Sequence, residues 1–513
     1  MSEKKKRVIL DGDSLSLDQF VAVTRHGAVV ELLPKSIEKI EASRRVVEDL
    51  LIQGRPMYGI NTGFGRFADV AIPENEINLL QLNLIRADAV GVGEPLPVDV
   101  VRGILLLRAN SIIKGYSGAR LEVIQLLLDM LNRRVHPVIP AKGSVGASGD
   151  LCPLSHMVLP MIGEGEVELN GTILPGKDGL RSVGLVPVEL RAKEGLALIN
   201  GTPVMTSLAA LGLHDALVLQ RSADIVAALT VESLRGIVDA FDPRIHDIRG
   251  QIGQVESAAN LRKLLDGSSA VTHQGQVRMQ DAYSLRCIPQ IHGASRMALA
   301  YVRSVVDAEL NAATDNPLVF TDTGDVFSGG NFHGQPVAVA ADTMGIAVAE
   351  LGNISERRIA KLVDPALNHG LPAFLVRQGG INCGFMVPQY AAAALVSENK
   401  ILAHPACVDS IPTSAGQEDH VSMGTIGARK ARTIVEHVQT VLGIEWMCAA
   451  QAVDLQGDFP LGRGTRRAYD LLRESVPFLE NDRAFYEEQR IAAAYIADEV
   501  LLQGVQEEVG LLA

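Results

Sequence analysis

Three small residues in the first third of the chain, Ala147, Ser148 and Gly149, can convert their own backbone into an electrophile. If the Gly149 nitrogen attacks the Ala147 carbonyl carbon and the ring loses water, a five-membered ring closes. Loss of the Ser148 hydroxyl as a second water then leaves a 4-methylidene-imidazol-5-one. Gly149 suits this reaction because it has no side chain to obstruct its nitrogen and can adopt the dihedral angles of a tight turn. The same tripeptide is also typical of an ordinary turn, so the surrounding sequence must decide between the two.

Five other stretches of sequence are rich in side chains that take part in chemistry. They are Tyr58–Gly65 (YGINTGFG), Asn200–Thr202 (NGT), Gln280–Cys287 (QDAYSLRC), Thr314–Pro317 (TDNP) with the following Gly329–Gly334 (GGNFHG), and Gln417–His420 (QEDH). The tyrosine loop fits neither the dinucleotide-binding pattern nor the phosphate-binding loop. Taken singly, each stretch also has an ordinary interpretation as a turn, a helix cap, a solvated arginine or an exposed helix end.

Composition and charge exclude several classes of protein. The 513 residues are 47% hydrophobic but only 4% aromatic, which predicts a large core of aliphatic side chains. The formal charge of -13 leaves no basic surface that could neutralise phosphates, so we expect no nucleic-acid partner. A membrane span needs about 20 nearly uncharged residues. The long apolar segment that begins at Pro203 carries several charged side chains, so we expect a core helix and no membrane partner.

The cysteines and histidines give no sign of a metal site. The five cysteines are scattered and never spaced as Cys-x-x-Cys, which is typical of reduced thiols and not of a disulfide framework or a zinc site. The twelve histidines are likewise dispersed, so we expect no bound metal. The basic cluster Lys4–Arg7 is followed by no apolar segment, and we interpret it as a solvated tail. These features predict a cytoplasmic protein.

The hydrophobic pattern predicts a mainly α-helical protein with two domains. Residues 1–110 form a smaller mixed α/β domain that carries the tyrosine loop, and residues 111–513 form a helical bundle with the electrophile loop and the C-terminal helices. The predicted strands cover 7–10, 28–33 and 164–173, and the predicted helices cover 37–53, 77–89, 121–134, 203–235, 294–314, 336–362, 388–402 and 427–454, with amphipathic helices over 466–509. Helices this apolar commonly bury their remaining faces against other subunits, so we expect an oligomer.

The motifs match one protein family in order and spacing. Gly143–Leu151 (GSVGASGDL), Tyr283–Cys287 (YSLRC) and Ser328–His333 (SGGNFH) resemble segments of the methylidene-imidazolone ammonia-lyases and aminomutases, and the similarity runs from about Leu10 to at least Trp446. Within that family the pattern is most similar to bacterial histidine ammonia-lyases. The resemblance implies an aspartase/fumarase-like bundle of long helices and a homotetramer in which each active site draws on three subunits. It also implies a methylidene-imidazolone group formed from residues 147–149, with no external cofactor.

The resemblance also implies roles for individual residues. Tyr58 would take the β-hydrogen of an amino acid substrate, and because a phenol has an ordinary pKa of about 10, it needs neighbours that favour the phenolate. Arg286 would grip the substrate carboxylate in a bidentate pair. The residues that would line the electrophile and stabilise charge on its carbonyl oxygen are Asn200, Gln280, Tyr283 and Asn316. The remaining contacts to the electrophile or the substrate would come from Phe332, Gly65 and Gln417.

Two carboxylates bear on the choice of substrate. Glu418 matches a position where histidine-specific members carry a glutamate, and a carboxylate suits an imidazole or a cationic side chain. Asp88 departs from the family, because histidine-specific members have Ser-His where this chain has Ala87-Asp88. Asp88 could accept a hydrogen bond from an imidazole or a phenol, select a more basic side chain, or signal a different product. Alternatively, it only pairs with a neighbouring arginine such as Arg86.

The sequence therefore predicts a carbon–nitrogen lyase that eliminates ammonia from an α-amino acid to give an α,β-unsaturated acid. We expect the substrate to be histidine or a similar polar or aromatic amino acid. A 2,3-aminomutase and a tyrosine or phenylalanine ammonia-lyase are alternatives within the same family. A non-catalytic scaffold is an alternative of a different class, and the intact tripeptide, Tyr58 and Arg286 argue against it.

Overall fold

The computed structural model describes residues 6–513 and divides the chain into two compact units. Unit 1 comprises Met1–Leu211, Arg303–Ala341 and Pro405–Arg429, and unit 2 comprises Gly212–Val302, Asp342–His404 and Lys430–Ala513. The proposed domain boundary at residue 110 stays a prediction. Lys4 and Lys5 of the basic cluster lie outside the described residues.

The described chain is mainly α-helical, as the sequence predicts. The helices wholly within unit 1 are α1 (Leu17–Thr24), α2 (Pro34–Gln53), α3 (Ile77–Asp88), α4 (Val98–Ile113), α5 (Leu121–Asn132), α6 (Leu151–Val158), α7 (Gly176–Ser182) and α8 (Glu194–Ile199). Those wholly within unit 2 are α10 (Pro243–Asp247), α11 (Ile252–Leu264), α12 (Tyr283–Arg286), α15 (Met386–Leu402), α17 (Arg463–Arg473), α18 (Tyr486–Ala497) and α19 (Val500–Val509). The remaining four, whose residues are shared between the units, are the longest: α9 (Pro203–Ser233), α13 (Ile288–Glu309), α14 (Gln335–Val363) and α16 (Gly424–Gln456).

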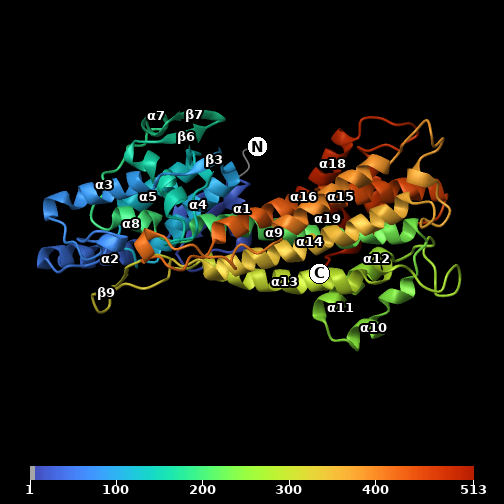
Figure 1. The fold of residues 1–513 in the computed structure, drawn as a ribbon, viewed down its shortest axis with the longest axis horizontal. Helices are drawn as coiled ribbons and strands as arrows, with labels where there is room; N and C mark the ends of the chain where they lie inside the picture. Colours follow the sequence, from blue (N-terminus) through green and yellow to red (C-terminus); the bar gives the residue numbers. More distant parts are fainter. Residues whose placement is uncertain (1–5) are drawn as a thin grey trace. The chain divides into compact units, whose positions relative to one another are not determined.

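Short strands form small sheets in unit 1. Strands β1 (Arg7–Leu10) and β2 (Val29–Leu32) pair in parallel, and β8 (Leu318–Phe320) and β9 (Asp325–Phe327) pair as an antiparallel hairpin. Strand β3 (Val92–Pro95) pairs antiparallel with β5 (Pro140–Lys142), and β4 (His136–Pro137), β6 (Glu166–Leu169) and β7 (Thr172–Pro175) form a sheet in that order. The β6–β7 hairpin is drawn close to α7 (Figure 1).

Glycines allow the unit 2 parts of α14 and α16 to pack closely. A Cβ added to Gly352 of α14 would lie 2.9 Å from a methyl group of Val438 in α16, and one added to Gly345 would lie 3.2 Å from Ile434. At these distances a side chain at either glycine would crowd α16, so the two helices pack more closely than larger residues would allow. Helix α14 is long and apolar enough to cross a membrane by length and composition, but 72% of its apolar window is buried inside the protein, which is typical of a core helix.

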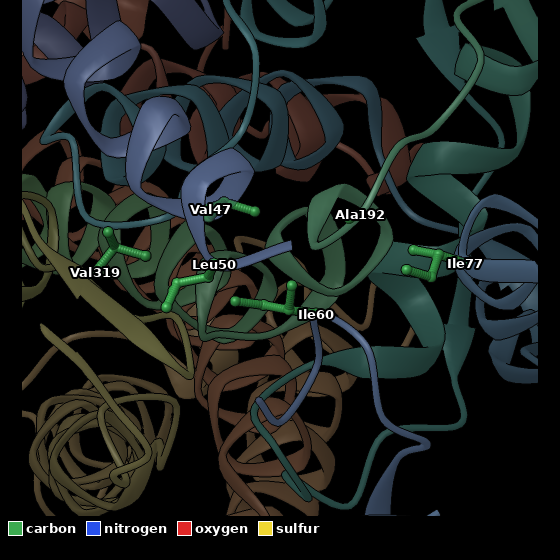
Figure 2. Close-up of a cluster of buried hydrophobic side chains, with 6 residues drawn as sticks. All are labelled: Val47, Leu50, Ile60, Ile77, Ala192 and Val319. Carbon is green, nitrogen blue, oxygen red and sulfur yellow. The ribbon is translucent and has the colours of Figure 1, made fainter. Parts of the chain in front are cut away.

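A compact apolar cluster in unit 1 supports the tyrosine loop. The fully buried Ile60 packs with Val47 and Leu50 of α2, while Ile77 opens α3 and belongs to the same cluster. Figure 2 shows the six members, which also include Ala192 and Val319. Because Ile60 is only two residues from Tyr58, this cluster fixes the loop that carries the tyrosine.

Candidate active site

The tripeptide Ala147–Gly149 lies in a strained turn immediately before α6. Ser148 has φ of +48° and Gly149 has φ of +80°, so two consecutive residues adopt the left-handed region. Ser148 is unusual there, because an L residue with a side chain pays a conformational cost that neighbouring contacts must offset. Strained backbone of this kind is frequent at functional sites.

The backbone of Gly201 holds this turn in place. Gly201 donates its N–H to the carbonyl of Ser148 at 3.1 Å, and its own carbonyl accepts the N–H of Asp150 at 2.7 Å. The nitrogen of Gly149 lies between these two bonds and takes part in neither. A Cβ on Gly149 would overlap the carbonyl of Gly201, so both the dihedral angle and the close approach require glycine at this position.

Asp150 ties the same turn to the start of α9. Its Oδ2 accepts the N–H groups of Val204 at 3.0 Å and Met205 at 2.9 Å, where a carboxylate is favoured by the helix dipole. Its Oδ1 accepts the hydroxyl of Thr425. Burial raises the pKa of Asp150 to about 6, and these hydrogen bonds oppose that increase. No role for Asp150 or Thr425 follows from the sequence alone, because their contacts depend on residues distant in the sequence.

Glu418 is the acidic side chain in contact with the tripeptide. Ser148 Oγ donates to Glu418 Oε1 at 3.3 Å, and Thr413 Oγ1 donates to Glu418 Oε2 at 2.8 Å. Residues 413 and 418 also exchange backbone hydrogen bonds, so the segment that carries Glu418 forms a closed loop. The QEDH motif therefore follows a single 3-10 turn, Ser414–Gly416, and does not end an α-helix. Glu418 is half-buried, whereas Gln417 is exposed.

The loop that carries Tyr58 lies against the loop that carries Glu418. The phenol oxygen of Tyr58 accepts the N–H of Gly65 at 3.3 Å, and a Cβ on Gly65 would lie 2.6 Å from Ser414 Oγ. Burial raises the pKa of Tyr58, the Gly65 N–H opposes the increase, and the carboxylates of Glu418 and Asp88 add to it. The described neighbours of Tyr58 therefore favour the neutral phenol. A general base was expected to have neighbours that favour the phenolate.

Asp88 is the last residue of α3, where the helix dipole already places negative partial charge. Burial, with a further contribution from Glu418, raises the pKa of Asp88 to about 6. Arg86 is not the partner of Asp88. The Arg86 guanidinium pairs with Glu164 instead, with Nε 3.1 Å from Oε1. Asp88, Glu418 and Tyr58 therefore form one electrostatically coupled group with a surplus of negative charge.

Two asparagines lie beside Gly201. Asn200 Nδ2 donates to the carbonyl of Asn316 at 2.9 Å, and Asn200 Oδ1 is buried without a hydrogen-bond partner among residues 6–513. Asn316 Oδ1 accepts the N–H of Gly329 at 2.7 Å and the hydroxyl of Ser328, which holds the start of the SGGNFH motif. Phe332, later in that motif, is half-buried.

The three remaining sequence-predicted residues belong to unit 2. Tyr283 is 69% exposed at the start of α12, and the Arg286 guanidinium carbon lies 4.7 Å from the centre of its ring. Arg286 Nε donates to the carbonyl of Asp281 at 2.9 Å, and Gln280 is exposed. Unit 1 thus brings together Tyr58, Asp88, Ser148 and Glu418, and in unit 2 Arg286 lies against the ring of Tyr283.

Comparison with known proteins agrees with these observations. The sequence model of the family described as aromatic amino acid lyase matches residues 15–474. Histidine ammonia-lyase 2 of Fusobacterium nucleatum is 58% identical over 509 residues, which cover 99% of this chain and 100% of that protein. The crystal structure of histidine ammonia-lyase from Trypanosoma cruzi has 43% identity and a TM-score of 0.91, covering 98% of this chain and 96% of that chain. Tyrosine aminomutase from Streptomyces globisporus has 37% identity and a TM-score of 0.95, covering 99% of this chain and 100% of that chain. The chain therefore belongs to the aromatic amino acid lyase family.

Proposed function

We propose that this carbon–nitrogen lyase eliminates ammonia from histidine, or from a similar amino acid with a polar or cationic side chain, to give the α,β-unsaturated acid. The observation that carries the proposal is the contact of 3.3 Å between Ser148 Oγ and Glu418 Oε1. Ser148 Oγ leaves as water when the ring forms, and the contact places a carboxylate that can bind an imidazole beside the Cβ that would become electrophilic. The high identity to a protein named histidine ammonia-lyase supports the same substrate class.

The residues at 147–149 fit a methylidene-imidazolone group. The turn is already tight at Ser148 and Gly149, and the Gly149 nitrogen is not used in the bridge to Gly201. The buried Asn200 Oδ1, which lacks a partner among the described residues, provides a polar atom for the ring or for a bound amine. The group would supply an electrophile that activates the substrate amino group for departure, and no external cofactor is required.

We assign the remaining steps to side chains of this protein. Arg286 binds the substrate carboxylate, which fixes the β-carbon relative to Tyr58. Tyr58 takes the β-hydrogen at its phenol oxygen. Asn200, Asn316, Gln280 and Tyr283 stabilise charge at the electrophile, Phe332 packs beside it, and Gly65 and Gln417 line the substrate. Glu418 and Asp88 bind the polar end of the substrate side chain.

We further propose that the enzyme is a homotetramer with shared active sites. A base at Tyr58 needs nearby positive charge, and the described neighbours in its own unit are acidic. Arg286 and the exposed Tyr283 would supply the missing side chains from another copy of the chain. A groove between α13 and α14, lined by apolar residues such as Ile291 and Ile346, offers a surface for helix packing between subunits.

A 2,3-aminomutase is the second candidate. The TM-score of 0.95 to tyrosine aminomutase favours it, and so does Asp88, which departs from the pattern of the histidine-specific members. Both activities share the loss of ammonia, and they differ only in whether ammonia is returned to the β-carbon. Incubation with histidine, tyrosine and phenylalanine, followed by measurement of ammonia and β-amino acids, separates them.

Ser148→Ala tests the electrophile. Only Ser148 can supply the methylidene carbon, so the variant should lose turnover and should also lose the mass deficit of two waters that ring formation gives the wild-type chain. Intact-protein mass spectrometry, ammonia release and circular dichroism provide the three measurements. A variant that keeps normal turnover, or a wild-type protein of full unmodified mass that is nevertheless active, would refute the proposal.

A further inference from the structure

A fully buried ion pair lies in unit 1 and has no part in the steps assigned above. Lys193 Nζ donates to Asp315 Oδ2 at 2.6 Å, and the two side chains are 0% and 1% exposed. The loss of hydration of two buried charges offsets much of their attraction, and apolar replacement of such pairs is often neutral for stability. The pair therefore requires an explanation other than its contribution to stability.

Hydrogen bonds connect this ion pair to the side chain of Asn200. Asp315 Oδ1 accepts the N–H of Asn316 at 2.6 Å, and the carbonyl of Asn316 accepts Asn200 Nδ2 at 2.9 Å. Because Lys193 binds one carboxylate oxygen of Asp315, it fixes the orientation of the other. The position of the Asn200 amide thus depends on Lys193 through two intermediate residues.

The backbone of Asn200 is held by another side chain, that of Arg108, which interacts with Asp315 through charge. The buried Arg108 donates from Nη1 to the Asn200 carbonyl at 2.6 Å and from Nη2 to Ser111 Oγ at 2.9 Å. The next residue, Gly201, carries the two hydrogen bonds to the electrophile turn. Loss of Lys193 should therefore disturb the Asn200 side chain while leaving the backbone that shapes the turn in place.

We propose that Lys193 is a positioning residue for the lyase reaction: by orienting Asp315, it sets the amide of Asn200 against the electrophile. The inference rests on the proposed function, in which Asn200 lines the electrophile. A positioning role predicts that loss of Lys193 affects turnover but not ring formation, whereas a purely structural role would change both. Ring formation depends on Gly201 and should not require Lys193, whereas turnover should.

The test is the double variant Lys193→Met/Asp315→Asn, because Lys193→Met alone would leave an unpaired carboxylate buried. The double variant should keep the oligomeric state and the mass deficit of two waters. Its kcat should fall by about 10- to 100-fold, the usual effect of a misplaced group, with KM changed by less than about threefold. The near-UV absorption of the ring should also change, because the Asn200 amide no longer has a fixed position beside it.

A second buried pair provides the matched control. Arg358 and Glu445 in unit 2 are both 0% exposed and have no role in the proposed reaction. The variant Arg358→Met/Glu445→Gln should change kcat by no more than about twofold.

Three results would overturn the positioning role. They are a Lys193→Met/Asp315→Asn variant with wild-type kcat, one that forms no ring, and one that does not fold, since the last two would place the pair in maturation or in stability. Failure of the proposed function is recognised separately, because it would appear in the wild-type protein as a missing mass deficit or as absent ammonia release.

Discussion

The side chain that contacts Ser148 within one chain is acidic. Glu418 bonds the Ser148 hydroxyl, and Glu418 and Asp88 both oppose ionisation of Tyr58. A phenol in this environment is a poor base until positive charge arrives. In the proposed tetramer, the ammonium group of the substrate and Arg286 of another subunit bring that charge, so the base would become effective only when the substrate is bound.

Replacement of Tyr58 by phenylalanine tests the base. The variant keeps the aromatic ring of the side chain but removes its hydroxyl group. The kcat should therefore fall by about 10²- to 10⁴-fold, the usual contribution of a positioned general base. Ammonia release under saturating substrate measures the effect. The mass deficit of two waters must persist, to show that only proton transfer was lost. A variant with full electrophile content and unchanged kcat would require a different base.

Asp88 should make substrate preference depend on pH. Its pKa is raised from 3.8 to about 6, so its carboxyl group is charged above pH 6 and neutral below. The ratio of kcat/KM for a cationic side chain to that for a neutral one should therefore fall as the pH drops from about 7 to about 5. Histidine itself titrates near this range, so the cationic substrate should be a histidine doubly methylated on the imidazole, compared with phenylalanine.

The matched variant is Asp88→Asn, which keeps the size of the side chain and removes its charge. At pH 7 its preference ratio should be lower than that of the wild type, and the step near pH 6 should be absent. The wild type should also favour histidine over phenylalanine, because an unpaired carboxylate is costly against a phenyl ring. A phenylalanine-preferring wild type, or the same pH step in Asp88→Asn, would remove Asp88 from the pocket.

At the scale of elements, packing and not regular secondary structure holds the Tyr58 loop. Ile60 anchors one end of the loop in the apolar cluster of Figure 2, and Gly65 lies against Ser414 at the other end. Tyr58 is two residues before Ile60, and its phenol oxygen accepts the N–H of Gly65, so its position depends on α2 and on the loop that carries Glu418.

Ile60→Ala should destabilise the protein and reduce activity together. Ile60 is fully buried, and truncation of such a side chain leaves a cavity that costs about 2–5 kcal/mol. Denaturant unfolding gives the free energy, and kcat reports the displacement of Tyr58. Ile52→Ala is the control, because Ile52 is 84% exposed and should change stability by less than about 0.5 kcal/mol. Equal effects of the two substitutions would contradict the anchoring role.

Elements with clear boundary residues could be predicted from the sequence. Pro203 follows Asn-Gly-Thr, and α9 begins at that proline. Helix α4 was not predicted, because Val98–Ile113 is buried along nearly its whole length, including Arg102, Arg108 and Asn110, and so has no amphipathic period. Helix α13 begins at Ile288, before the predicted start at residue 294, because the polar His292 in its first turns is buried against Asp224.

The candidate site was less accessible to sequence reasoning. The tripeptide could be recognised from its chemistry, and the residues around it only from resemblance to a family. Nothing in the spacing places Glu418 beside Ser148 or connects Lys193 with Asp315, since these contacts join distant segments. The raised pKa of Tyr58 also follows from burial and from two acids that only the folded chain brings close.

At the scale of the whole molecule, the proposed homotetramer would build each active site from more than one copy of the chain. Coexpression of Tyr58→Phe and Arg286→Ala subunits tests this directly. Each variant alone should be nearly inactive. If each site takes Tyr58 and Arg286 from different subunits, random mixing should leave about a quarter of the sites with both residues intact.

Purified mixed tetramers, isolated with two different affinity tags, provide the measurement. Their ammonia release should approach that quarter of the wild-type rate, and unmixed proteins combined after purification serve as the control. Activity no higher than that of the two parent variants would mean that Tyr58 and Arg286 act from the same subunit, and it would remove the argument for shared sites.

The bonds from Ser148 to Gly201 and from Val145 to Met423 also have a consequence for the life history of the protein. The bond between Val145 and Met423 joins segments that the ribosome produces far apart in time, so the turn acquires its full set of contacts only after most of the polypeptide has been synthesised. Under the proposed chemistry, the mass deficit of two waters then shows that a given molecule has reached its native state at least once. In a pulse-labelled culture, mass spectrometry would give the fraction of labelled chains that carry the deficit at each time, and so the rate at which new chains reach the native state.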